Sequence, residues 1–104
     1  MEKLITMVAA GALAVAGTSV LAGGDAAAGK AKYATCQGCH GPAGVSANPV
    51  WPNLAGQKDG YLVKQLKAFR DGTRTDPMMS PMAKPLSDED IDNLVAYLST
   101  AACK

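Results

Sequence analysis

Two cysteines and the only histidine of the chain stand within five consecutive residues, Cys36-Gln37-Gly38-Cys39-His40. This C-x-x-C-H motif places two thiols and an imidazole on one short stretch of backbone. Three kinds of site use such a cluster: a covalently attached haem with the histidine as axial ligand, a dithiol that undergoes disulfide exchange, and a zinc site. These sites require different folds or additional ligands, so the rest of the sequence distinguishes them.

The N-terminal segment predicts export. A short polar start, Met1-Glu2-Lys3, precedes a charge-free run that is rich in Ala, Val and Leu. The run closes with Val20-Leu21-Ala22, which has small residues at the two positions that a signal peptidase recognises. We therefore expect residues 1–22 to be a cleaved signal peptide and residues 23–104 to form one domain in the periplasm. An uncleaved membrane anchor is the alternative, since about 20 apolar residues span a bilayer, although the glycines and many alanines make a poor span.

The expected domain is small, and its cysteine count is odd. A chain of this size often needs a disulfide, a metal or a cofactor to complete its core. Residues 23–104 contain Cys36, Cys39 and Cys103, and an odd number of cysteines does not indicate a disulfide framework. Cys103 lies beside the C-terminal Lys104, where it is either an unpaired thiol without a role or the site of an intermolecular disulfide. We expect something other than disulfides to hold the domain together.

The charge of the chain is nearly balanced, with a formal net charge of +1 at pH 7. This balance argues against a nucleic-acid-binding protein, which normally carries a strongly basic face. The charges are nevertheless segregated. The middle of the chain is basic and its end is acidic, with Lys58, Lys64, Lys67, Arg70 and Arg74 in the first group and Asp88, Glu89, Asp90 and Asp92 in the second.

Sequence patterns predict three helices and no convincing strand. The first helix covers residues 26–35 and follows Asp25, a good N-cap. The second covers residues 60–71, with its lysines and Arg70 directed toward solvent. The third begins at Ser87, with acidic residues in its first turn. Its apolar residues recur at i, i+3, i+4 and i+7, namely Ile91, Leu94, Val95 and Leu98.

Two irregular segments connect these helices. Residues 41–60 and 76–85 contain many prolines and glycines and are predicted to be loops, the second of them extended or turning. The domain is therefore all-α with long loops, which are unusual in a small domain unless they wrap around something. An all-α fold lacks the βαβ context of a thioredoxin-like dithiol, and a zinc site would need a second pair of ligands. The motif consequently favours a haem bound through thioethers to Cys36 and Cys39, with His40 as an axial ligand.

The second axial ligand is expected to be a methionine. Ligation by two histidines is excluded by composition, whereas the loop around Pro77 supplies Met78, Met79 and Met82. Thioether sulfur is a soft ligand that favours ferrous iron and raises the reduction potential. Methionines ordinarily fill cores, but little hydrophobic periodicity surrounds these three. The apolar residues expected around the porphyrin, if they are not simply core, are Trp51, Leu54, Leu62, Leu66 and Leu98.

Four segments together resemble the small bacterial class I c-type cytochromes, especially the c5, c-553 and c4-domain branch. The similarity extends over essentially the whole of residues 23–104. Residues 24–30 (GDAAAGK) are similar to that family's first helix, and residues 36–41 (CQGCHG) to its haem site. Residues 51–57 (WPNLAGQ) resemble its haem-packing loop, and residues 77–90 (PMMSPMAKPLSDED) resemble its methionine loop and last helix.

The resemblance implies a cytochrome c fold, in which three main helices and long loops surround one haem c per chain. In that family the axial methionine lies eight positions before the serine that caps the last helix. Counting back from the serine implies Met79, with Met82 and Met78 as alternatives. The proline that opens the Pro-Asn-Leu stretch accepts a hydrogen bond from the axial histidine through its carbonyl oxygen. This contact implies that Pro52 orients His40.

The resemblance also implies a reason for Gly29, which otherwise weakens the first predicted helix. The first and last helices of the family cross each other. Gly29 would allow a close approach between them, and Tyr33 would then pack near Leu94 and Tyr97.

These features predict a periplasmic carrier of single electrons and not an enzyme. With both axial positions filled, the iron would alternate between the ferric and ferrous states without binding a substrate. Two alternatives remain open: a haem enzyme or gas sensor with an absent or displaceable methionine, and a module tethered through the N-terminal segment or Cys103. We expect redox proteins as partners of a monomer, no nucleic acid, and membrane contact only through those partners unless the N-terminal segment is retained. Lys58, Lys64 and Lys67 either steer an acidic partner or form an ordinary solvated helix face.

Overall fold

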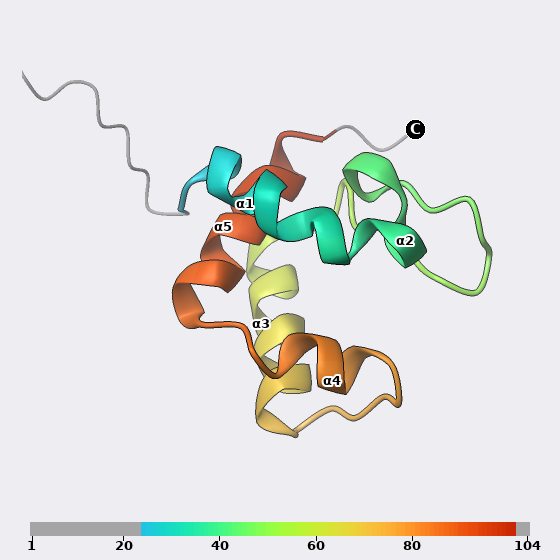
Figure 1. Cartoon of the computed structure of the whole chain (residues 1–104), viewed down its shortest axis with the longest axis vertical. Helices are drawn as coiled ribbons and strands as arrows, with labels where there is room; N and C mark the ends of the chain where they lie inside the picture. The colour runs from blue at the N-terminus through green and yellow to red at the C-terminus, as the bar shows by residue number, and fades with distance from the viewer. Residues whose placement is uncertain (1–23, 102–104) are drawn as a thin grey trace, which may run out of the picture.

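The computed structural model describes residues 24–101, which form an all-α fold (Figure 1). The elements follow one another as α1 (Ala26–Lys32), the 3₁₀ turn η2 (Tyr33–Thr35), α2 (Gln37–His40), the 3₁₀ turn η3 (Pro42–Gly44), α3 (Asp59–Asp71), α4 (Met79–Ala83) and α5 (Asp88–Ser99). Within this range no β-strand is formed, which confirms the predicted fold class. The expected signal peptide, residues 1–22, and Cys103 lie outside the described residues. None of the described helices has the length and apolar character needed to cross a membrane.

Side-chain caps begin the first and last helices. Asp25 Oδ1 accepts hydrogen bonds from the backbone N–H groups of Ala27 at 2.9 Å and Ala28 at 3.4 Å. Ser87 and Asp90 form a reciprocal capping box, in which Asp90 N–H donates to Ser87 Oγ at 2.9 Å and Ser87 N–H donates to Asp90 Oδ2 at 3.0 Å. Each cap satisfies N–H groups that have no acceptor inside the helix. The caps explain why both helices begin where the sequence predicted.

The first and last helices cross closely, as the resemblance implied (Figure 1). A Cβ atom built on Gly29 would lie only 1.8 Å from Asn93 O and 3.0 Å from Leu94 N, so the approach requires a glycine. At the start of α1, Asp25 N–H donates to Asn93 Oδ1 at 2.8 Å across the same contact. The crossing fixes the position of the segment that follows α1, and this segment carries the cysteines.

The hydrophobic core lies where η2 and α3 meet α5. Its buried residues are Tyr33, Leu62, Ile91, Leu94, Val95 and Leu98. The ring centroids of Tyr33 and Tyr97 are 5.4 Å apart in a tilted arrangement, which is a favourable geometry for an aromatic pair. The predicted packing of Tyr33 near Leu94 and Tyr97 is therefore confirmed.

Arg70 does not project into solvent as the helix pattern predicted. Its side chain is only 19% exposed, and its guanidinium donates to Asp88 Oδ1 at 2.7 Å, to Leu86 O at 3.3 Å and to Asp71 Oδ1 at 2.8 Å. The pattern placed Arg70 on the polar face of α3, but the segment that leads into α5 returns to this face. The contacts therefore join the C-terminal end of α3 to the start of α5.

The segment predicted as an extended or turning loop, residues 76–85, contains the short helix α4. This part of the prediction was wrong. Pro81 is the third residue of α4, where a backbone N–H would have no acceptor inside the helix, so the proline costs no hydrogen bond. Asp76 Oδ2 accepts hydrogen bonds from Met78 N–H and Met79 N–H, each at 2.8 Å. A local cap thus makes one short turn of helix stable among the prolines.

Candidate haem site

The two cysteines of the C-x-x-C-H motif lie about one helical turn apart. Cys36 precedes α2, and its carbonyl oxygen accepts hydrogen bonds from the N–H groups of Cys39 at 3.2 Å and His40 at 3.0 Å. Residues three positions apart in a helical turn share one side of the backbone. Both cysteines are free thiols and both are half-buried. Two thiols held in this way are available for thioether bonds to one haem.

The surroundings of Cys36 are unlike those of a thiol that undergoes disulfide exchange. Burial raises the pKa of the Cys36 thiol, an effect that the Thr35 hydroxyl opposes and Cys39 adds to. Exchange dithiols instead have lowered pKa values, because the thiolate is the reactive species. Residues 24–101 also contain no group of three or more His, Cys, Asp or Glu side chains that would hold a metal ion. The raised pKa of Cys36 therefore does not favour the dithiol alternative.

His40 is the buried polar residue of the described chain, with 7% of its surface exposed. Its Nδ1 atom lies 2.9 Å from Pro52 O. Because a carbonyl oxygen only accepts, Nδ1 carries the hydrogen and donates it. In the neutral imidazole Nε2 then carries the lone pair, and no hydrogen bond within residues 24–101 engages it. The hydrogen bond expected between His40 and Pro52 is present, and it leaves Nε2 in the form that coordinates iron.

Two residues fix the turn that follows His40. Gly41 has φ = 82°, and a Cβ atom built on it would lie 1.8 Å from Val45 O. The Tyr33 hydroxyl donates a buried hydrogen bond to Gly41 O at 2.6 Å. Mainly through burial, the pKa of Tyr33 is raised to about 12, so the hydroxyl remains a donor at neutral pH. The sequence predicted Tyr33 only as a packing residue, because no pattern along the chain indicates which carbonyl its hydroxyl will reach.

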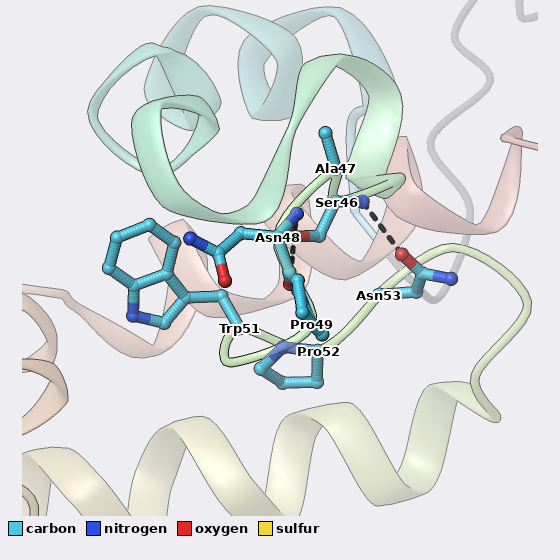
Figure 2. Close-up of a pocket in the computed structure, with 7 residues that line it drawn as sticks. All are labelled: Ser46, Ala47, Asn48, Pro49, Trp51, Pro52 and Asn53. Atoms are coloured by element: carbon cyan, nitrogen blue, oxygen red, sulfur yellow. Dashed lines mark hydrogen bonds between the residues drawn. The ribbon is translucent and has the colours of Figure 1, made fainter.

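The loop that supplies Pro52 is tied to the cysteine–histidine segment by polar side chains. Ser46 N–H donates to Asn53 Oδ1 at 2.7 Å, and Ser46 Oγ donates to Cys39 O at 3.3 Å. Residues 46–49 and 51–53 line a pocket, and Figure 2 shows the indole of Trp51 on one side of this loop with Asn53 on the other. The contacts of Ser46 hold the loop where Pro52 O meets the imidazole.

The apolar residues expected around the porphyrin divide into two groups. Leu62 and Leu98 are buried in the core, with 5% and 2% of their surfaces exposed. Leu54 and Leu66 are half-buried against that core, and Trp51 is half-buried in its loop. The half-buried residues are the ones with apolar surface left to cover a further group.

The three methionines differ in exposure. Met78 and Met82 are 51% and 46% exposed, whereas Met79 is half-buried. Met79 is the first residue of α4, which packs against α3 (Figure 1). No hydrogen bond within residues 24–101 joins Met79 to His40 or Pro52. The structure therefore brings His40 and Pro52 together directly and holds Met79 on a separate segment.

The residues present fit a c-type haem. They provide two free thiols, a buried imidazole with an available Nε2, soft thioether sulfurs and half-buried apolar side chains. A nitrogen ligand combined with soft sulfur suits iron in a haem better than a hard cation, which prefers oxygen.

Comparison with known proteins identifies the family. Residues 26–102 match the family model described as Cytochrome c. The chain belongs to the cytochrome c family. It is 50% identical over 80 residues to cytochrome c-554(548) of Halomonas halodenitrificans, a match covering 74% of this chain and 96% of that protein. It is 44% identical over 75 residues to a thiosulfate dehydrogenase electron acceptor of Thiomonas intermedia, covering 70% of this chain and 34% of that protein.

A solved structure shows the same fold. The crystal structure of reduced recombinant cytochrome c4 from Pseudomonas stutzeri superposes with a TM-score of 0.73 at 40% sequence identity, covering 78% of this chain and 47% of that chain. This cytochrome c is thus a c4-type domain of the class I c-type cytochromes. It binds haem c covalently, and it is an electron-transfer protein rather than an enzyme. It spans nearly the whole length of the Halomonas relative but less than half of the c4 chain.

Proposed function

We propose that this cytochrome carries single electrons in the periplasm with one haem per chain, ligated by His40 and Met79. The observation that carries the proposal is the Nδ1–H hydrogen bond from buried His40 to Pro52 O at 2.9 Å. It fixes the ring and leaves Nε2 available, which is the arrangement found for most metal-ligating histidines. The haem supplies a one-electron couple between ferric and ferrous iron.

The protein's own residues perform the remaining tasks. Cys36 and Cys39 would anchor the haem through thioether bonds. Pro52 O accepts a hydrogen bond from His40 Nδ1–H, which raises the basicity of the imidazole. Met79 is favoured over Met78 and Met82 because it is half-buried, whereas the other two are about half exposed. Half-buried Trp51 and Leu54 would exclude water from a bound haem, which would favour the less charged ferrous state.

The partners are redox proteins, and the electron donor is a dehydrogenase or another periplasmic oxidoreductase. A relative named as a thiosulfate dehydrogenase electron acceptor supports this assignment. Lys58 and Lys64 on or beside α3 are exposed and available to attract an acidic partner. Such charges mainly raise the rate of encounter, so the electron-transfer rate should fall as ionic strength rises.

We further propose that residues 1–22 are removed on export and that the mature protein is a monomer. Intact-mass measurement of protein purified from the periplasm tests both the cleavage and the haem, because each changes the mass of the chain. Non-reducing electrophoresis shows whether Cys103 forms an intermolecular disulfide.

The decisive experiment is the optical spectrum of protein matured in a host that attaches c-type haem. Wild-type protein should show a c-type spectrum with the ferric methionine charge-transfer band, and the ferrous form should not change on addition of CO. Met79→Ala should abolish the band and allow CO to bind. Met78→Ala and Met82→Ala are the matched controls and should retain the band.

Two results would overturn parts of the proposal. Loss of the band in Met82→Ala or Met78→Ala, but not in Met79→Ala, would assign the ligand to another methionine. A wild-type ferrous protein that binds CO readily would instead indicate an open iron site and favour the gas sensor or haem enzyme.

A further inference from the structure

The geometry points to Asp76 as the residue that positions Met79, and we propose that it determines how firmly the methionine is retained on the iron. The inference rests on the proposed function, because it takes Met79 as the axial ligand. Asp76 lies three positions before Met79 and is half-buried. Asp76 and Ser80, with the hydrogen bonds that they make to each other and to the backbone of Met78 and Met79, are called the Asp76–Ser80 brace.

The brace encloses the backbone of Met79 from both sides. Asp76 Oδ2 accepts hydrogen bonds from Met78 N–H and Met79 N–H, each at 2.8 Å. In the other direction, Asp76 N–H donates to Ser80 Oγ at 2.9 Å, and Ser80 N–H donates to Asp76 O at 3.0 Å. Four hydrogen bonds therefore hold this turn, one at Met78, one at Met79 and two at Ser80, and two of the four use the Asp76 carboxylate.

The ends of the segment that carries the three methionines, residues 76–85, are held by residues other than Asp76 and Ser80. Arg74 N–H donates to Ala68 O at 3.1 Å, and its guanidinium donates to Gln65 Oε1 at 2.6 Å, which joins the start of the segment to α3. Arg70 donates to Leu86 O at 3.3 Å at the other end. These contacts close the segment but do not touch Met79. The Asp76 carboxylate is the side chain that bonds the Met79 backbone directly.

The brace matters because a methionine ligand competes with water and with external ligands for the same iron position. A backbone that stays folded around Met79 keeps the sulfur at a high effective concentration. If the Asp76 carboxylate is removed, Met78 N–H and Met79 N–H lose their acceptor and the turn opens more often. An external ligand binds only the open form, so its apparent affinity rises in proportion to the open fraction.

Imidazole titration of the ferric holoprotein tests the proposal. Loss of a side-chain helix cap typically weakens a turn enough to raise the population of the open form about fivefold, so Asp76→Ala should bind imidazole about fivefold more tightly than wild type. Asp76→Asn should bind imidazole nearly as weakly as wild type does, because its amide oxygen still accepts a hydrogen bond. The methionine charge-transfer band should remain at low imidazole concentration in both variants.

Asp25→Ala is the matched control. Asp25 also caps a helix by accepting two backbone N–H groups through one carboxylate oxygen, but it does so at the start of α1. Removing it should lower the stability of the protein without changing imidazole affinity. Equal tightening in Asp25→Ala and Asp76→Ala would show that general destabilisation is the cause and would overturn the proposal.

A second measurement covers the case in which Asp76→Ala does not fold. In wild-type ferrous protein, the amide hydrogens of Met78 and Met79 should exchange slowly with deuterium because both are hydrogen-bonded. Rapid exchange of both amides would overturn the proposal.

Failure of the proposed function is distinguishable from failure of this inference. If Met79 is not the axial ligand, Met79→Ala will retain the methionine charge-transfer band. If Met79→Ala loses the band but Asp76→Ala binds imidazole as wild type does, the inference about Asp76 alone fails.

Discussion

Gly29→Ala should destabilise the protein even though alanine is the better helix former. In an exposed helix this substitution is stabilising by about 1 kcal/mol. At Gly29, however, the added Cβ would lie 1.8 Å from Asn93 O and 2.5 Å from Asn93 C. Both atoms belong to the backbone of α5, so no flexible side chain can move aside, and α1 itself has to move.

The size of the effect follows from that movement. Restoring ordinary van der Waals contact requires α1 to withdraw from α5 by on the order of 1.5 Å. The withdrawal loosens the packing of Tyr33, which is 1% exposed, against Leu94, which is 2% exposed. Overpacking of this kind costs about 3 kcal/mol, and the gain in helix propensity offsets about 1 kcal/mol of it. We expect a net loss of about 2 kcal/mol in the free energy of unfolding, or roughly 10 °C in the melting temperature.

Urea unfolding of the holoprotein, followed by far-ultraviolet circular dichroism, measures this loss as a lower midpoint at an unchanged slope. Gly60→Ala in α3 is the matched control, because a Cβ atom built there meets no atom within 4 Å. It should raise stability by about 0.5 kcal/mol. If Gly29→Ala proves as stable as Gly60→Ala, the helices do not approach as closely as described and the reasoning is refuted.

Three further substitutions and conditions have defined outcomes. Tyr33→Phe should lower the free energy of unfolding by about 1 kcal/mol in urea titrations, because the buried hydrogen bond from the Tyr33 hydroxyl to Gly41 O is lost. The loss stays moderate because Gly41 O still accepts a hydrogen bond from Gly44 N–H, and an unchanged urea midpoint would contradict the prediction. Ala43→Gly should raise the thermal midpoint, because Ala43 has φ = 56° in the left-handed region, and a lower midpoint would show that the strain is absent. Hydrogen bonding by Arg70 lowers the pKa of Asp88, so the stability this pair provides is present above about pH 4 and is lost as the pH falls through the folded-state pKa. Urea midpoints at several pH values should therefore fall less steeply with acid for Arg70→Gln than for wild type, and parallel curves would argue against the pair.

Much of the fold follows from local patterns in the sequence. The capping residues Asp25 and Ser87 mark helix starts that the structure reproduces, and the second predicted helix, residues 60–71, agrees with α3 to within one residue at its start. Both signals are local in the sequence: a capping side chain bonds the first turn of its own helix, and the spacing of apolar residues marks the face that packs against the core.

The features that the sequence did not predict depend on contacts between distant segments or on local backbone bonding. Arg70 was expected in solvent because its partner Asp88 lies in another helix. Helix α4 was missed because the prolines of residues 76–85 predict a loop unless the Asp76 cap is recognised. The site shows the same division: the C-x-x-C-H motif is evident from spacing, whereas Pro52 and Met79 were expected only through the resemblance to a family.

The contact between Asp25 N–H and Asn93 Oδ1 joins residues 68 positions apart, and Gly29 meets the same turn of α5. Closing so long a loop delays formation of the contact, because chain entropy is lost before the packing energy is gained. In a chain that emerges from its N-terminal end, α1 has no partner until α5 has followed it. The crossing also fixes the segment that carries Cys36 and Cys39, so these two cysteines reach their final positions only after α5 has packed against α1.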